Sequence, residues 1–233
     1  MTFNFLEGEV LLIDKPLGWT SFDVVNSIRY TIKRALNVKK IKVGHAGTLD
    51  PLATGLLIVC TGKYTKQIDS FQGLDKVYIG SMHLGASTPS FDRETKVDQT
   101  FDISNISNDH IISTAKRFEG EIDQTPPVFS AVKIDGKRAF EYARKDNEVK
   151  IKSRKVTINE FKLLNLVLPE LDFMVSCTKG TYIRSLVSDF GKALNNGAYM
   201  SSLRRTSIGE YSVSDAYSVE ELKAKIQAQY NHE

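Results

Sequence analysis

The chain is poor in the residue types that build disulfide frameworks and metal centres. Its 233 residues include only two cysteines, one tryptophan and four histidines. Cys60 and Cys177 lie in apolar stretches and lack metal-ligand spacing, and the histidines are not spaced like zinc ligands either. This pattern predicts two buried free thiols, no metal site and a reducing compartment, so we expect a cytoplasmic protein.

Long hydrophobic runs are also missing. No segment approaches the roughly 18 apolar residues that a membrane helix needs. Residues 1–14 carry no basic stretch ahead of an apolar core, so no signal peptide is expected. The composition, with 41% hydrophobic and 25% charged residues, is ordinary for a globular protein without membrane attachment.

Charge is nearly balanced, at a formal net value of +3, but it is unevenly distributed. Residues 29–42 contain six basic side chains and no acidic one, and further basic clusters occupy residues 150–155 and the pair Arg204-Arg205. Each cluster alone is more often a solvated face than a binding site. Three separated clusters together favour an anionic polymer as substrate.

The most informative segment is a turn-rich stretch with a single carboxylate, Asp50. Gly44, Gly47, Pro51 and Gly55 surround it, and these residue types allow sharp turns or positive φ. The apolar run 56–60 follows and is typical of a buried strand. We therefore expect a stiff loop that projects Asp50 from the edge of a sheet, as a nucleophile or base; a plain turn-forming aspartate is the alternative.

The remaining pattern mixes strands and helices without regular βα alternation, which predicts an α+β fold. Strands are expected near residues 8–14, 56–60, 76–84, 156–168 and 171–177, a hairpin at 130–138 with Asp135-Gly136 as its turn, and helices near 20–36, 109–118, 181–194 and 218–229. We expect residues 86–108 to form a mobile polar excursion. Residues 195–209 are expected to form a loop that carries Arg204-Arg205.

Two further side chains extend the hypothesis. Arg184 lies at a strand-to-helix junction, where it could align and ionise a carboxylate, or be an ordinary helix arginine. Tyr78 lies on a strand, where its ring could stack on a base or fill the core. One carboxylate without a metal motif fits chemistry at a sugar's anomeric carbon. These residues alone indicate a carboxylate enzyme acting on RNA or a phosphorylated sugar.

Six segments in order carry a family resemblance. They are Lys15–Ser21, Gly44–Gly55, Lys76–Tyr78, Gln124–Lys133, Cys177–Leu186 and Leu203–Thr206. Together they resemble the bacterial tRNA pseudouridine synthase B family, which isomerises uridine to pseudouridine at position 55 in the TΨC loop of tRNA. The resemblance implies the pseudouridine synthase fold: a mixed, mostly antiparallel central sheet with flanking helices and an RNA-binding cleft.

The resemblance also implies roles for individual residues, with no cofactor and no metal. Asp50 would be the catalytic aspartate, Tyr78 would stack on the target base and Arg184 would pair with Asp50. The substrate-binding set would be His45 at the flipped nucleotide, Lys66 at a phosphate, Leu203 packed at the active site, and Lys15. The partner would be the TΨC stem-loop of tRNA, bound by a monomer.

One departure from the family pattern concerns the C-terminus. Many members carry a C-terminal RNA-binding domain of the PUA type, whereas here we expect a catalytic domain at 1–212 and a short helical tail at 213–233. Weaker or more local tRNA binding is the expected result. Two alternatives remain: an RNA-binding or tRNA-folding protein that acts without turnover, and a pseudouridine synthase for another RNA.

Overall fold

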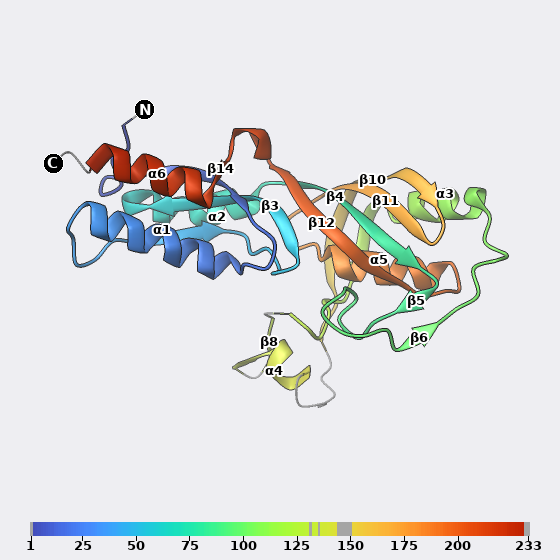
Figure 1. The fold of residues 1–233 in the computed structure, drawn as a ribbon. Coiled ribbons are helices and arrows are strands. Elements are labelled where there is room, and N and C mark those ends of the chain that lie inside the picture. The colour runs from blue at the N-terminus through green and yellow to red at the C-terminus, as the bar shows by residue number, and fades with distance from the viewer. Residues whose placement is uncertain (1, 131, 135, 144–150, 231–233) are drawn as a thin grey trace. The chain divides into compact units, whose positions relative to one another are not determined.

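The structure is a computed structural model that describes residues 2–130, 132–134, 136–143 and 151–230. It divides into two compact units (Figure 1). Unit 1 comprises residues 1–78 and 204–233, and unit 2 comprises residues 79–203. Residues 213–233 therefore belong to the same unit as the N-terminal residues.

Unit 1 contains the first and the last elements of the chain. They are β1 (Val10–Lys15), α1 (Ser21–Ala35), β2 (Val43–Ala46), β3 (Ala53–Thr61), the 3-10 helix η1 (Gly62–Gln67), α2 (Ile68–Gly73), the start of β4 (Lys76–Leu84), the end of β12 (Ala198–Ile208), β13 (Tyr211–Ser212), the 3-10 helix η2 (Val213–Asp215), β14 (Tyr217–Ser218) and α6 (Val219–Tyr230). The strand order is β14–β1–β3–β12, with β2 paired to β3 and β13 to β12. The β1–β3 and β2–β3 pairs are antiparallel, and β1–β14 is parallel.

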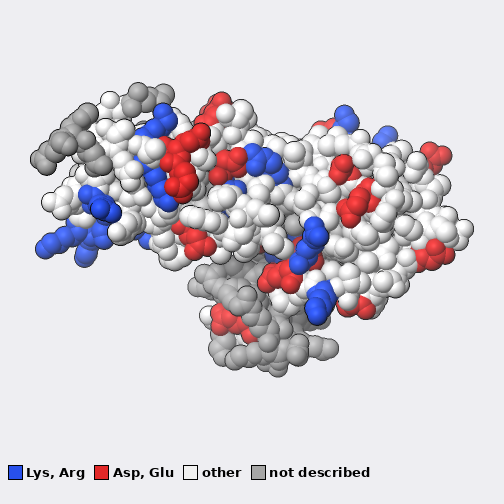
Figure 2. Space-filling model, viewed as in Figure 1, with Lys and Arg blue, Asp and Glu red and all other residues white. Residues whose placement is uncertain are grey.

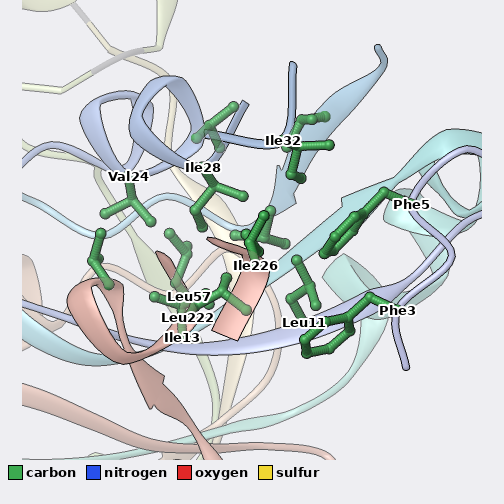
Figure 3. Close-up of a cluster of buried hydrophobic side chains, with 14 residues drawn as sticks. Phe3, Phe5, Leu11, Ile13, Val24, Ile28, Ile32, Leu57, Leu222 and Ile226 are labelled. Carbon is green, nitrogen blue, oxygen red and sulfur yellow. The ribbon is translucent and has the colours of Figure 1, made fainter. Parts of the chain in front are cut away.

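The core of unit 1 explains why α1 and α6 form. Figure 3 shows Val24, Ile28 and Ile32, spaced by one helical turn on α1, packed with Leu222 and Ile226 of α6. Both helices cover one face of the sheet, and Thr20 caps α1 through a reciprocal box with Asp23. Burial of each such aliphatic side chain contributes about 1.5–3 kcal/mol.

Strand β3 is buried on both faces, which accounts for its continuous apolar sequence. Leu57 and Val59 face the α1–α6 core, while Leu56, Ile58 and Cys60 join Phe71 of α2 and others in a second cluster. The predicted buried strand at 56–60 is confirmed. The strand that leads out of the Asp50 loop is therefore one of the most firmly packed in the unit.

Unit 2 contains the middle of the chain. Its elements are the rest of β4, β5 (Ala86–Ser87), β6 (Gln99–Thr100), α3 (Asn108–Lys116), β7 (Gly120–Gln124), β8 (Lys133–Ile134), β9 (Lys137–Arg138), α4 (Ala139–Ala143), β10 (Arg154–Val167), β11 (Glu170–Cys177), α5 (Ile183–Ala193) and the start of β12. The main strand order is β4–β11–β10–β7, with antiparallel β10–β11 and β10–β7 pairs. The β8–β9 pair matches the expected hairpin, although Asp135 lies outside the described residues.

The α+β prediction, with a mostly antiparallel sheet and flanking helices, is confirmed, but one expected loop is wrong. Residues 198–208 form the long strand β12 instead of a loop. Buried side chains recur every two or three residues along β12 and include Met200, Leu203 and Arg205, with half-buried or exposed ones between them. A buried arginine in this pattern disguised the strand, because arginine is rarely found fully inside a protein.

Residues 86–98 are also more firmly held than their polar composition suggests. Thr88, Ser90 and Asp92 are almost completely buried. The hydroxyls of Thr88 and Ser90 donate to the Asp92 carbonyl at 2.7 and 3.2 Å, and Thr95 bonds back to Ser90 at 2.8 Å. Here the polar side chains satisfy buried backbone groups, which the prediction of a mobile excursion did not anticipate.

Candidate active site

Asp50 lies in the loop that joins β2 to β3. The two strands pair up to Ala46 and Ile58, so the loop projects from the end of a two-stranded ladder. Gly47 and Gly55 take φ values of +91° and +103°, which favour glycine, and the Asp50 carbonyl accepts from Ala53 N–H at 3.0 Å. Asp50 itself is half-buried, and this geometry is the stiff carboxylate-bearing loop expected from the sequence.

Two residues at the start of α1 hold the residues on both sides of Asp50: Gly18, which precedes the helix, and Ser21, its first residue. Ser21 Oγ accepts from the Leu49 N–H at 2.9 Å and donates to the Leu49 carbonyl at 3.2 Å. The Gly18 N–H donates to the Pro51 carbonyl at 2.8 Å. Two of the segments recognised in the sequence are thus one hydrogen-bonded assembly in unit 1.

Lys15 lies behind this assembly and is fully buried. Its Nζ donates to the carbonyls of Trp19 at 2.6 Å and Pro16 at 2.9 Å, and it lies 3.5 Å from the Pro51 carbonyl. Burial lowers the pKa of Lys15 to about 8, while the negative charge of Asp50 opposes that shift. This position suits a lysine that fastens the loops, rather than one that reaches out to a phosphate.

Arg205 on β12 is a second buried cation beside the loop, only 1% exposed. Its Nε donates to the Leu56 carbonyl at 2.7 Å and its Nη2 to the Gly47 carbonyl at 3.0 Å. Sequence analysis treated Arg204-Arg205 as a basic cluster for an anionic polymer, and that assignment is wrong for Arg205, which is inside the protein. Arg204 makes a two-pronged ion pair with Asp14, at 2.6 and 3.0 Å.

His45 and Lys66 also belong to unit 1. His45 is on β2 opposite Val59, and its pKa is lowered by burial and then by the charge of Arg205, against an opposing effect of the Gly47 backbone. The imidazole is therefore neutral at pH 7. Lys66 is exposed near the end of η1.

Tyr78 and Leu203 are buried at the ends of their units: Tyr78 is the last residue of the first part of unit 1, and Leu203 is the last residue of unit 2. Lys76, two positions before Tyr78 on β4, donates through Nζ to the Gln72 carbonyl at 2.6 Å and to the Leu74 carbonyl. The stacking of Tyr78 on a base remains a prediction, as does the placement of Leu203 at the active site.

Arg184 is in the first turn of α5 and 3% exposed. Its Nη1 and Nη2 donate to the carbonyls of Ser90 at 3.1 Å and Phe129 at 2.9 Å, and its Nε lies 3.6 Å from a carboxylate oxygen of Asp92. Asp92 is a partner that sequence reasoning missed, because it lies in a polar stretch read as a loop. Since Asp50 belongs to unit 1, the predicted Asp50–Arg184 pair remains a prediction.

The Gln124 segment is tied to the start of α5. The side chain of Gln124 accepts from the Tyr182 N–H at 2.7 Å and donates to its carbonyl at 3.1 Å, and Ser185 Oγ donates to the Thr125 carbonyl at 2.8 Å. Two more of the recognised segments therefore meet within unit 2. Each unit thus gathers its own set of these segments around a buried arginine.

Two kinds of feature, metal-ligand groups and membrane-spanning helices, can be checked in the part of the chain that is described. No group of three or more His, Cys, Asp or Glu side chains there is placed to hold a metal ion. Among those same residues, no helix is long and apolar enough to cross a membrane.

Comparison with known proteins defines the class. The family model for the N-terminal domain of TruB family pseudouridylate synthases matches residues 33–183, and the model for the tRNA pseudouridylate synthase B C-terminal domain matches residues 184–233. The chain belongs to the TruB family of pseudouridylate synthases. Asp50 and Arg184 fall within these matches.

Individual relatives with similar sequences point to one kind of enzyme within the family. The chain is 55% identical over 217 residues to a tRNA pseudouridine synthase B of Flavobacterium johnsoniae, covering 93% of this chain and 95% of that protein. It is equally similar, at 55% over 217 residues, to a tRNA pseudouridine synthase B of Phocaeicola vulgatus, covering 93% and 92%. The predicted resemblance is confirmed.

Solved structures agree with the fold. A Cbf5–Nop10–Gar1 complex contains a chain with a TM-score of 0.70 and 32% identity, covering 96% of this chain and 55% of that one. An H/ACA RNP bound to a substrate RNA containing 2'-deoxyuridine contains another, with a TM-score of 0.67 and 29% identity, covering 96% and 54%. The protein thus has the pseudouridine synthase fold, and it spans about half the length of these structural neighbours.

Proposed function

We propose that this protein isomerises uridine to pseudouridine at position 55 in the TΨC loop of tRNA. The observation that carries the proposal is the firm attachment of the Asp50 loop. Leu49 is hydrogen-bonded to Ser21, Pro51 to Gly18, and Gly47 to Arg205. A catalytic group held this firmly meets its substrate in a fixed geometry, with little entropy left to lose. Family membership supplies the reaction class.

The chemistry is balanced without a cofactor. The C1'–N1 glycosidic bond breaks, the uracil turns, and a C1'–C5 bond forms; one proton leaves C5 and one is gained at N1. Asp50 acts either by adding to the sugar or the base, or by removing a ribose proton. A deuterium substitution at C2' separates the routes, because only proton removal from C2' gives a primary isotope effect.

The remaining site residues take supporting roles in this proposal. Tyr78 stacks on the flipped base, and Leu203 packs beside it. His45, which is neutral at pH 7, contacts the flipped nucleotide through a hydrogen bond rather than as a cation. Lys66, which is exposed, faces a phosphate, and Arg184 orients Asp50.

The partner in this proposal is the TΨC stem-loop of tRNA. Figure 2 shows lysine and arginine side chains gathered over the α1 region of unit 1, where Lys39, Lys40 and Lys42 are exposed. Such residues neutralise phosphates and release counterions, so affinity falls steeply with salt. Flipping the uridine costs a few kcal/mol of unstacking, which phosphate contacts offset.

We further propose a cytoplasmic monomer whose catalytic domain spans residues 1–212 and whose segment 213–233 is a helical tail. The helix α6 within that tail packs on α1, with Leu222 and Ile226 in the shared core. This contact supports a structural role for the tail within unit 1.

The direct test is conversion of an unmodified tRNA transcript by the purified protein, with no added cofactor. Pseudouridine is mapped chemically along the whole tRNA. We expect modification at position 55, and a loss of roughly 10⁴-fold or more in Asp50→Asn, by analogy with the removal of other essential catalytic groups. Asp69→Asn, an exposed carboxylate on α2, is the matched control and keeps wild-type turnover.

The outcomes separate the alternatives. Normal turnover by Asp50→Asn would end the assignment. A wild-type protein that folds tRNA but modifies nothing would indicate a tRNA-folding function, which Asp50→Asn would then retain. Modification of a different RNA in a deletion-strain comparison would keep the chemistry and change the substrate.

A further inference from the structure

Arg205 is placed unlike a substrate-binding arginine. It is 1% exposed, and the residue before it, Arg204, makes the outward ion pair with Asp14. The guanidinium of Arg205 instead points into unit 1 and donates to two backbone carbonyls, those of Gly47 and Leu56. These carbonyls stand on either side of Asp50 in the sequence, so one side chain bonds the first residue of the loop and a residue of β3, the strand that follows it.

The backbone of Arg205 is also pressed against the loop. A Cβ added to Gly55 would lie 2.2 Å from the Arg205 carbonyl oxygen and 2.8 Å from its nitrogen. Gly55 takes a φ of +103°, so glycine is required there for two independent reasons. Strand β12 and the first turn-forming residues of β3, just after the Asp50 loop, are therefore in direct backbone contact at Gly55.

The donor geometry calls for arginine rather than for any cation. The two acceptors are bonded by Nε and by Nη2, two different nitrogens of one rigid planar fork. A lysine has a single nitrogen on a flexible stem, and so it could hold one carbonyl but not both in a fixed relation. The charge of Arg205 also reaches its neighbours, since it lowers the pKa of both Lys15 and His45.

We propose that Arg205 is a positioning residue for the isomerisation: its guanidinium fixes the Asp50 loop by bonding the carbonyl of Gly47, where the loop begins, and that of Leu56, in the strand that follows the loop. Arg205 does not touch the substrate. It sets the place of the Asp50 carboxylate, together with Ser21, which bonds Leu49, and Lys15, which lies against the Pro51 carbonyl. This inference rests on the proposed function, because it assigns the loop's rigidity to that reaction.

The experiment compares Arg205→Lys and Arg205→Met with wild type in kcat, KM and Tm. A carboxylate displaced by about 1 Å costs on the order of 100-fold in rate. We expect kcat to fall by about that factor in Arg205→Met, with partial rescue in Arg205→Lys, which restores one of the two bonds. KM, and the Kd for tRNA measured in an Asp50→Asn background, should change by less than about threefold, since RNA contacts are untouched.

Two controls separate positioning from general destabilisation. Lys223→Gln alters another cation of unit 1, which pairs with Glu220 on α6, and should leave kcat unchanged. Ile226→Ala removes a buried side chain between α6 and α1, lowers Tm and keeps kcat at a temperature well below its Tm. If kcat in the Arg205 variants falls only as far as in Ile226→Ala at matched Tm, the proposal is overturned.

A second measurement does not depend on turnover or on the variant's yield of active enzyme. Amide hydrogen exchange of the protein alone should speed up within residues 47–56 in Arg205→Lys, while α6 stays protected. Unchanged exchange there would refute the positioning role even if the wild type proved to modify no tRNA. Faster exchange with no uridine conversion by wild type would refute the proposed function, but it would still show that Arg205 holds the loop.

Discussion

The two units each contain a buried arginine that holds a loop, and the partners of the two arginines differ. In unit 1, the hydrogen bonds of Arg205 go to the backbone carbonyls of Gly47 and Leu56. In unit 2, Arg184 donates to the carbonyls of Ser90 and Phe129 and also lies 3.6 Å from the buried carboxylate of Asp92. A guanidinium is well suited to both tasks, because its planar fork donates in several fixed directions.

The difference concerns what is left behind when the arginine is lost. Removing Arg205 takes a donor from two backbone carbonyls, which carry no net charge. Removing Arg184 takes a cation from beside a carboxylate that is itself only 4% exposed, and an uncompensated buried charge is far more costly than a carbonyl. Arg184 is thus expected to matter more for stability, and Arg205 more for the geometry of its loop.

The largest expected effect comes from removing Arg184 from its contact with Asp92 in unit 2. Arg184→Met should lower the free energy of unfolding by about 3–5 kcal/mol, the usual cost of removing one partner of a buried ion pair. Arg205→Met should cost less, about 1–3 kcal/mol, since only carbonyls lose donors. Urea denaturation of both variants measures the difference.

A second change provides the control for that prediction. Adding Asp92→Asn to Arg184→Met removes the stranded charge and should recover part of the stability, whereas it should be harmful in the wild type. Equal losses for Arg184→Met and Arg205→Met, without recovery in the double variant, would contradict the distinction.

An intermediate effect concerns the basic clusters of the two units. Lys155 in unit 2 is paired with Glu121 at 2.5 Å, and Arg154 donates to the Gly180 carbonyl, whereas Lys39 in unit 1 is exposed beside further basic residues. We expect Lys39→Gln to reduce the slope of log K against log salt for tRNA binding by about 0.7–0.9, the value for one lost phosphate contact. Lys155→Gln should reduce this slope less. If Lys155→Gln reduced the slope more than Lys39→Gln, the RNA-binding surface would be in unit 2 instead of unit 1.

The smallest expected effect is a pH dependence that belongs to unit 1. The pKa of Lys15 is about 8 in the folded protein, against 10.5 for a free lysine. Between these values the unfolded chain binds more protons than the folded one, so stability from this group rises with pH from about 8 towards 10.5. The rise should be missing in Lys15→Met, and denaturation at pH 7.5 and 9.5 compares the two; parallel profiles would show that burial does not perturb Lys15.

Much of unit 1 could be predicted because its patterns are regular. The one-turn spacing of Val24, Ile28 and Ile32 predicted α1, the continuous run 56–60 predicted a doubly buried strand, and the glycines around Asp50 predicted its stiff loop. These features are local, and local spacing determines periodicity and turn type. The family resemblance came from the order of six segments, and the family match confirmed that resemblance.

What could not be predicted are the long-range polar contacts. Arg205 on β12 and Arg184 on α5 find their acceptors far away in sequence, at Leu56 and at Ser90. A polar residue that is buried through such a partner looks like a surface residue in the sequence, so β12 was taken for a loop and Asp92 went unnoticed. The composition of a segment does not predict which distant carbonyl will accept a hydrogen bond from an arginine in it.

Ser21 connects the start of helix α1 directly to the Asp50 loop. Its hydroxyl both accepts from and donates to the backbone of Leu49, one residue before Asp50, while Thr20 and Asp23 close the cap of the same first turn. Fraying of that turn would therefore break the Ser21 bonds to Leu49 in the same event. The capping of a helix is thereby linked to the Asp50 loop, so a residue in the first turn of α1 also contributes to how firmly Leu49, next to Asp50, is held.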